Sequence, residues 1–510
     1  MKHEAIATPG VSVPRLQFLG RDFTASIVVF LVAMPLCMGI AIASGVPPEK
    51  GLITGIIGGI IVGALAGSPL QVSGPAAGLA VIVYELVRDH GLSALGPILV
   101  LAGAIQFAAG VFRLGGWFKA ISPAVVHGML AGIGVLIVIG QFHVLFDERP
   151  LSSGPENLAA MPARLLGLST DIQATEIAFG VALLTIAAML GWEKWRPASL
   201  RLMPGALVGV LAGTIAAFAL GLEVARVEVP ASITAAISLP GDGFLGAYAN
   251  FGIVATALAI AFIASAETLL SAAAVDKMHD GVRTDYNKEL RAQGVGNLLC
   301  GVAGSLPMTG VIVRSSANVQ AGAITRASAI MHGVWILGFV AALPWLLREI
   351  PMAALGAILV VTGWRLVSLK HASHLYRDYG VLPVVIWATT LIMVVATDLL
   401  TGVLIGIALT VLELVPHLRR LRLRVFEASE DGAHAITLDG AATFVSLPRL
   451  AETLDRVPHG TNVRIDASRL DAVDHTSAEM LRDWFTRRRA SGASVEVTGG
   501  RGKFATLAGG

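Results

Sequence analysis

Two charged residues lie inside apolar segments, where a charge is costly. Arg314 stands in "GSLPMTGVIVRSSANVQAG" (304–322) and Glu267 in "FIASAETLLSAAAVDKM" (262–278). An arginine near the centre of a bilayer costs about 3 kcal/mol on insertion scales, so Arg314 needs a partner or a wet cavity. A bound oxyanion would match the planar N–H donors of the guanidinium. The alternative is that Arg314 snorkels to the membrane edge.

Glu267 lies deep in its segment, and Ser271 follows one helical turn later on the same face. Burial favours the neutral form of a carboxyl group, so Glu267 is a candidate for proton uptake near neutral pH. With the nearby hydroxyl it could instead hold Na⁺. A third interpretation is structural, with the carboxylate paired to Arg314 or to a backbone N–H.

Breaks rich in proline and glycine interrupt two apolar regions. "GSPLQVSGPAAGL" (67–79) predicts a half-helix that begins at Pro75, with unpaired N–H groups at Ala76, Ala77 and Gly78. Pro307 and Gly310 mark a second break, before a short segment that begins near Met308 and contains Arg314. Such N-termini bind anions, and matched breaks in two halves of a chain indicate a transporter's central site. The alternative is ordinary interhelical turns, or glycines that permit close helix packing.

The rest of the chain must hold these breaks within a membrane. Of its 510 residues, 55% are hydrophobic and only 14% are charged, with a mean hydropathy of +0.74. A bilayer needs spans of about 20 apolar residues. We expect full spans near 22–44, 48–66, 93–112, 121–145, 173–191, 202–222, 251–275, 288–304, 327–347, 351–367, 380–397 and 399–416. With the two half-helices, the prediction is 14 membrane segments.

Loop charges predict the orientation. With the N-terminus in the cytoplasm, thirteen basic residues fall in cytoplasmic loops and six in outside loops, which follows the positive-inside rule. The cytoplasmic set is Arg113, Lys119, Lys194, Arg196, Arg201, Lys277, Arg283, Lys288, Arg291, Arg326, Arg365, Lys370 and Arg377. We therefore expect an integral multi-pass protein of the inner membrane, if the source is bacterial, with both ends cytoplasmic. We expect no removable signal peptide.

Residues after the last span have a different character. "HLRRLRLRVFEASEDG" reads as a basic linker followed by an acidic turn. The segments "HAITLDG", "ATFVSL", "NVRIDAS" and "SVEVTGG" predict strands, and "SAEMLRDWFTRRRA" predicts a helix. The predicted domains are a cytoplasmic N-terminus (1–21), a transport domain (22–418), and a linker with a small α/β domain (419–510).

Several functions are not supported by the sequence. The net charge of +2 gives no reason to expect nucleic acid, and Cys37 and Cys300 imply no disulfide framework. His127, His143 and His332 stand alone, without metal-ligand spacing. There is no phosphate-binding loop and no visible pairing of a nucleophile with a base. We expect no enzyme activity, no metal and no cofactor.

The motifs resemble the SulP family of anion transporters, which carry a C-terminal STAS domain. The resemblance rests on "QVSGPAAGL" (71–79), "AETLLSAAAVDK" (266–277), "LPMTGVIVRSSANVQAGAITRASAIMHG" (306–333) and "RIDASRLDAVDHTSAEML" (464–481). It implies a multi-pass α-helical fold with a 7+7 inverted repeat, similar to uracil permeases. It also implies core and gate subdomains, with half-helices at positions three and ten.

The resemblance also implies a set of site residues. The substrate anion would lie where Ala76, Ala77 and Gly78 face Thr309, Gly310 and Val311, with Arg314 nearby. Glu267 and Ser271 match positions that couple transport to H⁺ or Na⁺. The bulky Val311 and Ile312 disfavour Na⁺, so a proton is the favoured coupling ion. Relatives often form homodimers.

The leading expectation is secondary active transport of a small inorganic oxyanion, with sulfate first, by H⁺ symport and alternating access. The alternatives are a bicarbonate or dicarboxylate transporter coupled to H⁺ or Na⁺, a passive anion channel or exchanger, a membrane sensor that signals through the tail, and a nucleobase permease. Backbone N–H groups and one guanidinium accept many oxyanions, so the residues do not identify the anion.

Overall fold

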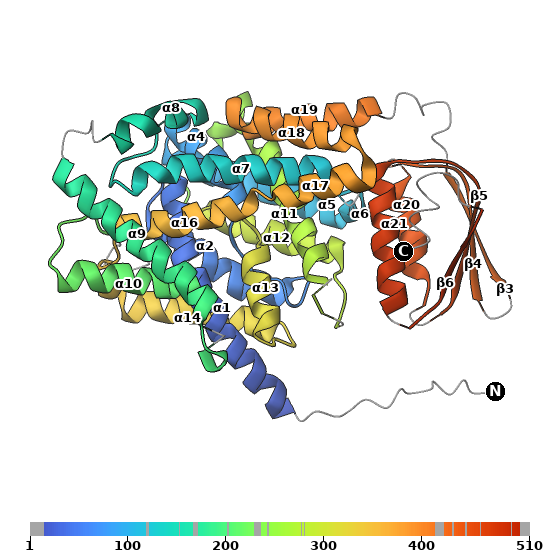
Figure 1. The fold of residues 1–510 in the computed structure, drawn as a ribbon, viewed down its shortest axis with the longest axis horizontal. Helices are drawn as coiled ribbons and strands as arrows, with labels where there is room; N and C mark the ends of the chain where they lie inside the picture. Colours follow the sequence, from blue (N-terminus) through green and yellow to red (C-terminus); the bar gives the residue numbers. More distant parts are fainter. Residues whose placement is uncertain are drawn as a thin grey trace.

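A computed structural model describes the chain from Arg15 to Gly499 (Figure 1). Within that range it leaves out 119–121, 152, 167–171, 201–202, 229–235, 242–243, 277, 280, 414–422, 431–432, 444–445, 459–460 and 491. Lys119, Arg201 and Lys277, which the charge count places in cytoplasmic loops, and the first part of the basic linker therefore lie outside the described residues.

The first half of the membrane region contains the seven expected segments. They are α1 (Arg15–Ala43); α2 (Pro48–Ile57) continued by the π-helical turn η1 (Gly58–Val62) and α3 (Gly63–Leu65); the half-helix η2 (Ala77–Leu79) with α4 (Ala80–His90); α5 (Leu95–Val111); α7 (Pro123–Val144); α9 (Ile172–Trp195); and α10 (Gly205–Ala219).

The second half repeats this order. Its segments are α11 (Phe251–Asp276), α12 (Tyr286–Val302), the half-helix α13 (Ile312–Gln320), α14 (Ala327–Ala342) with α15 (Pro344–Leu347), α16 (Met352–Leu366), α18 (Val381–Ala396) and α19 (Leu399–Glu413). The prediction of 14 segments is confirmed. Three helices were not expected: α6 (Gly115–Phe118), α8 (Gly154–Leu165) and the amphipathic α17 (Leu369–Tyr379).

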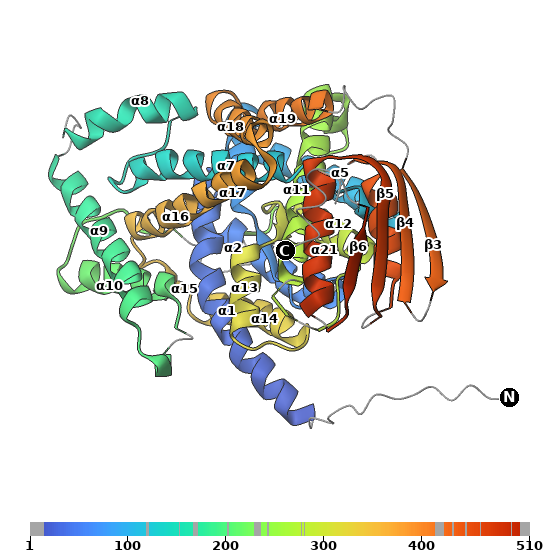
Figure 2. The same ribbon diagram turned by 45° about the vertical axis from the view of Figure 1, so that its right-hand side comes forward.

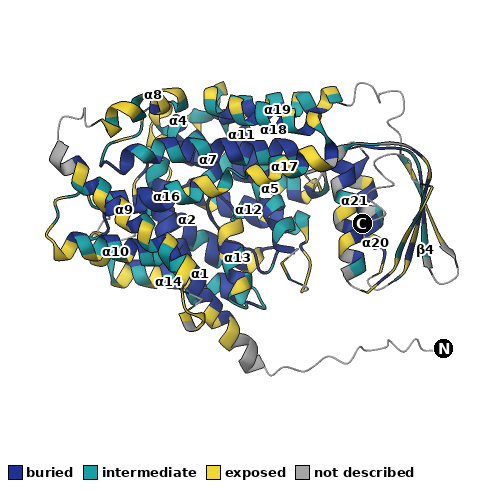
Figure 3. Cartoon of the chain, viewed as in Figure 1, coloured by how far each residue is buried: buried dark blue, intermediate teal, exposed yellow. Residues whose placement is uncertain are grey.

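Hydropathy and burial agree with a membrane setting. Among the described residues, seven helices are long and apolar enough to cross a bilayer, and four shorter helices are also apolar. Large apolar side chains are exposed on the outer helices, for example Leu183 on α9 and Ile215 and Phe218 on α10. Buried residues concentrate in the interior, along α1, α2 and α12 (Figure 3). An apolar exterior around such an interior is suited to lipid.

The two breaks meet in a short antiparallel ladder between β1 (Ser73–Pro75) and β2 (Met308–Gly310). Ser73 lies opposite Gly310, Gly74 opposite Thr309, and Pro75 opposite Met308. The predicted helix starts at Pro75 and Met308 are therefore wrong. Helical turns begin only at Ala77 and Ile312, because the residues before them are extended and pair across the two halves. Such pairing satisfies backbone groups that lipid cannot.

Contacts divide the helices into two groups. In the core subdomain α1 packs on α2 and α14, and α5 packs on α11 and α12. In the gate subdomain α7 packs on α16 and α18, and α9 packs on α10. Helix α1 also contacts α16 and α10, and η2 contacts α7, so the two subdomains meet beside the half-helices.

The tail forms a small domain with its own hydrophobic core. Its sheet has the order β3 (Leu423–Glu430), β4 (Ala433–Ala442), β5 (Val463–Val473), β6 (Val495–Thr498), in which only the β3–β4 pair is antiparallel. Helices α20 (Leu447–Arg456) and α21 (His475–Ala490) lie between this sheet and the membrane helices (Figures 1 and 2). Helix α20 contacts α6 of the membrane region.

Two expectations for the tail are wrong. The acidic end of the expected linker is strand β3, which pairs with β4 at the edge of the sheet. Its side chains point alternately to the two faces of the sheet. The strand expected at "ATFVSL" (442–447) is also wrong at its described residues, because β4 ends at Ala442 and α20 begins at Leu447. Phe444 and Val445 lie outside the described residues. Helix α20 was not expected.

Candidate functional site

The first half-helix begins with N–H groups that have no internal partner. Leu79 N–H bonds to Ala76 O at 3.2 Å, which closes the first turn. No described residue accepts a hydrogen bond from the N–H groups of Ala76, Ala77 or Gly78. These amides and the positive end of the helix dipole leave an electropositive surface at the start of η2 and α4.

On the second half-helix the expected amides are occupied. Gly310 N–H donates to Thr268 Oγ1 at 3.1 Å, and Val311 N–H donates to Val72 O at 2.9 Å. These two amides are therefore not available to an anion. Because β2 extends to Gly310, α13 starts only at Ile312. The amides without a described acceptor are therefore those of Ile312, Val313 and Arg314.

Arg314 is fully buried. Its exposed fraction is 0%, and its Nε, Nη1 and Nη2 atoms have no hydrogen-bond partner among the described residues. This burial rules out the snorkelling alternative. Arg314 is the third residue of α13, because the helix starts at Ile312. A buried cation without an anion is unfavourable, so the site is electrostatically prepared for a negatively charged ligand.

The guanidinium lies against strand β1. A Cβ atom placed on Gly74 would overlap Arg314 Nη1. Gly74 is directly opposite Thr309, and opposite residues of an antiparallel pair point to the same face. The guanidinium and the Thr309 side chain thus lie on the same side of the ladder.

Glu267, on α11, also lies beside the ladder of β1 and β2. A Cβ atom on Gly78 would overlap its Oε1, and the carboxyl group interacts with the Thr309 side chain. Its Oε2 atom is buried and has no partner among the described residues, and no described ion pair joins it to Arg314. Ser271 is buried one turn further along, and its hydroxyl also has no described partner. The structure therefore brings Glu267 to Gly78 and Thr309.

A polar framework that the sequence did not predict holds the ladder in place. Asn297 Nδ2 donates to Met308 O at 3.1 Å, and Asn297 Oδ1 accepts from Met308 N–H at 2.8 Å. Gln71 Nε2 donates to Thr268 O at 2.9 Å, beside Gly310. Ser315 Oγ accepts from Val72 N–H at 2.9 Å. Polar residues in otherwise apolar segments were the only signal for this framework.

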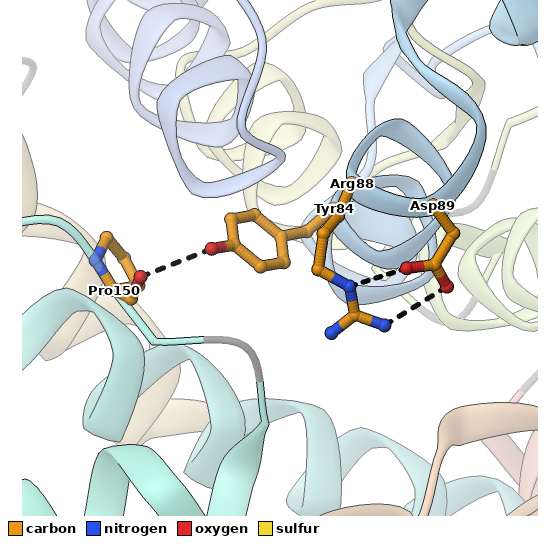
Figure 4. Close-up of polar contacts among 4 residues, drawn as sticks. All are labelled: Tyr84, Arg88, Asp89 and Pro150. Atoms are coloured by element: carbon orange, nitrogen blue, oxygen red, sulfur yellow. Dashed lines mark hydrogen bonds and ion pairs between the residues drawn. The ribbon is translucent and has the colours of Figure 1, made fainter.

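Near the middle of α4, the core contacts the gate. The Tyr84 hydroxyl donates to Pro150 O at 3.2 Å, across to the loop between α7 and α8 (Figure 4). Arg88 pairs with Asp89 on the same helix. A cavity beside this contact is lined by residues of α4, α7, α8 and α18, including Glu85, Gln141 and Asn157. The Tyr84–Pro150 bond joins the two subdomains across this end of the site.

Comparison with known proteins assigns the family. The model described as "Sulfate permease family" matches residues 19–390, well over half of the chain. The chain belongs to the sulfate permease family. Members of this family are transporters rather than enzymes, and the chain is an integral, multi-pass membrane protein. A second model, "Mlab, STAS domain", matches residues 425–508. The SulP resemblance with a STAS tail is confirmed.

Relatives of this sulfate permease family member carry different substrates in their names. It is 31% identical to "Putative sulfate transporter YvdB" of Bacillus subtilis over 77% of this chain and 73% of the relative. It is 24% identical to "Bicarbonate transporter BicA" of Synechocystis, over 82% of this chain and 73% of the relative. "The overall structure of SLC26A9" matches with a TM-score of 0.70 at 16% identity, covering 97% of this chain and 86% of that one. This last similarity establishes the fold.

Proposed function

We propose that the protein carries a small inorganic oxyanion, with sulfate as the first candidate, and that protons drive its uptake. The observation that carries this proposal is the fully buried Arg314 guanidinium, which has no described partner beside the start of two half-helices. The unpaired amides of Ala76, Ala77 and Gly78 and those at the start of α13 supply further donors. A tetrahedral oxyanion accepts hydrogen bonds in several directions, which suits donors on two elements.

Glu267 is the proposed proton carrier. Its carboxyl group stands against the first turn of the half-helix at Gly78 and has one unpaired oxygen. A neutral carboxyl group can sit there beside an anion, whereas a carboxylate would repel it. Anion and proton should therefore bind together. Na⁺ is the less favoured coupling ion, because Val311 and Ile312 bring no side-chain oxygen to the site.

Alternating access would follow from movement of the core subdomain, which holds both half-helices, against the gate. The contact between Tyr84 and Pro150 would have to break and re-form in each cycle. We also propose that both chain ends are cytoplasmic and that the protein works as a homodimer. The contact of α20 with α6 supports the tail lying on the side of the loop that carries Arg113.

Bicarbonate is the second candidate substrate. It is favoured by the similarity to the bicarbonate transporter named above, which is weaker than the similarity to the putative sulfate transporter. A dicarboxylate would need space for a second carboxylate. A passive channel would use the same site but would not need Glu267.

Uptake by proteoliposomes tests this function. Labelled sulfate, bicarbonate, chloride and fumarate are compared with no gradient, with a pH gradient and with a Na⁺ gradient. We expect sulfate to accumulate only when the outside is acidic, and Glu267→Gln to lower this accumulation sharply while exchange of sulfate continues. A channel would be indicated if Glu267→Gln left uptake unchanged. Accumulation of uracil without any anion would reject the proposal.

A further inference from the structure

Three buried polar groups come from neighbouring helices, of which α1 packs against both α13 and α14. They are the Cys37 thiol on α1, the Arg314 guanidinium on α13 and the His332 ring on α14, and each residue has an exposed fraction of 0%. The guanidinium acts electrostatically on both the thiol and the ring. The transport mechanism proposed above gives His332 no role, although it is a titratable group beside an unpaired cation.

The hydrogen bonding of His332 fixes which nitrogen is free. Nδ1 lies within hydrogen-bonding distance of Ala329 O, which can only accept, so Nδ1 carries the proton of the neutral ring. Nε2 then holds the lone pair, and it is buried with no partner among the described residues. His332 can therefore take up one proton, and only at Nε2.

Close packing holds the ring in this position. Gly59 in η1 lies so near that a Cβ atom there would stand 2.8 Å from His332 Cε1 and 2.6 Å from Gly333 Cα. Neither glycine carries a charge. Among the described residues, the charged group that acts on the ring is Arg314 from α13, and the Cys37 thiol from α1 lies near the same guanidinium. Packing therefore keeps the ring in place, and the charge of Arg314 affects whether the ring takes up a proton.

Electrostatics couples this proton to the anion. While the site is empty, a proton on Nε2 would place a second positive charge beside the buried guanidinium, where the low dielectric strengthens repulsion. A bound dianion cancels the guanidinium charge and attracts the imidazolium. Proton and anion then favour each other's binding, and by linkage the effect is reciprocal.

We propose that His332 accepts a proton at Nε2 when an anion binds beside Arg314, which makes it a second proton-coupling residue besides Glu267. This inference rests on the proposed function. His332 acts through Arg314 and the anion rather than by contact with substrate, and its effect is on the number of protons taken up with each anion.

Calorimetry measures that number directly. Sulfate is titrated into the full-length protein in nanodiscs, in buffers of different ionisation enthalpy, between about pH 5.5 and 7.5, the range in which histidine usually titrates. The slope of the binding enthalpy against the buffer enthalpy gives protons taken up per sulfate. The wild type is compared with Glu267→Gln, His332→Gln and His143→Gln.

We expect Glu267→Gln to retain proton uptake and His332→Gln to lose about one proton per sulfate relative to the wild type. His143→Gln is the matched control, because His143 is also fully buried, with Nε2 at the carbonyl of Asn157 and Nδ1 unpartnered, but its electrostatic neighbours are Arg164 and Glu148. It should match the wild type.

The inference is overturned if His332→Gln takes up as many protons as the wild type, or if Glu267→Gln takes up none. The second result decides the question even if His332→Gln does not fold. If sulfate fails to bind the wild type at all, the proposed function fails as well. Binding without a proton linked to His332 rejects only this inference.

Discussion

Gly74 and Arg314 are in direct contact across the meeting point of the two halves: a Cβ atom on Gly74 would overlap Nη1 of the guanidinium. Gly74 is the central residue of strand β1, and Arg314 is in the first turn of α13. The missing side chain at Gly74 is therefore what permits the arginine to lie against the ladder. Placement of the cation depends on a residue 240 positions away (314 − 74).

Gly74→Ala should displace the guanidinium without removing its charge. We expect sulfate affinity to fall about tenfold, which corresponds to about 1.4 kcal/mol. Isothermal titration with sulfate measures this loss. Gly338→Ala is the matched control, because Gly338 is on α14 with nothing within 4 Å of an added Cβ. Equal affinities for Gly74→Ala and the wild type would show that the contact has no role in binding.

Arg314→Met should weaken sulfate binding by about 10- to 100-fold, since a hydrogen bond to a charged group contributes about 1.5–3 kcal/mol. It should leave the thermal stability of the sulfate-free protein unchanged or higher, because it removes a buried cation that has no partner. Only the wild type should then gain stability when sulfate is added. Thermal unfolding with and without sulfate tests both points. A variant that fails to fold would assign Arg314 a structural role.

Tyr84→Phe should favour the conformation in which the core and gate separate beside Pro150. Loss of one hydrogen bond worth about 1 kcal/mol changes the population about fivefold. A cysteine introduced by Gly140→Cys in the cavity reports opening by its reaction with an impermeant maleimide, because Cys37 and Cys300 are buried. We expect faster labelling in Tyr84→Phe/Gly140→Cys than in Gly140→Cys alone. Unchanged labelling would mean that the Tyr84 bond does not hold this end closed.

Asn297→Ala should destabilise the protein and weaken anion binding together. It would leave both Met308 N–H and Met308 O without their side-chain partner inside the core. Each buried group left unsatisfied costs about 1–3 kcal/mol. We expect a lower melting temperature and a higher Kd for sulfate. If the melting temperature fell but the Kd did not change, the ladder would not control the geometry of the anion site.

Local patterns in the sequence were sufficient for much of the fold. The length and spacing of apolar runs predicted the 12 full spans, because a bilayer imposes a minimum length on each. Pro75, Pro307 and the glycines near them located both breaks, because proline and glycine are the residues that most readily interrupt a helix. The free-energy cost of a charge in lipid singled out Glu267 and Arg314, which the structure places beside the ladder of β1 and β2.

Long-range pairing could not be predicted from these patterns. The helix starts shifted to Ala77 and Ile312 because β1 and β2 pair across the halves, and nothing local to either segment indicates that partner. The same pairing occupies the Val311 amide. The roles of Thr268 and Asn297 likewise depend on what the fold brings to them. In the tail, β3 was not predicted as a strand because it contains several charged residues. An edge strand tolerates such residues.

Anomalous diffraction from crystals grown with selenate would locate the bound anion, since selenate is a tetrahedral dianion that replaces sulfate. We expect a selenium peak between the N–H groups of Ala76–Gly78 and the first turn of α13, beside Arg314. The peak should vanish in Arg314→Met at the same selenate concentration. A selenium peak elsewhere in the membrane region, with this site empty at saturating selenate, would show that the anion does not bind between the half-helices.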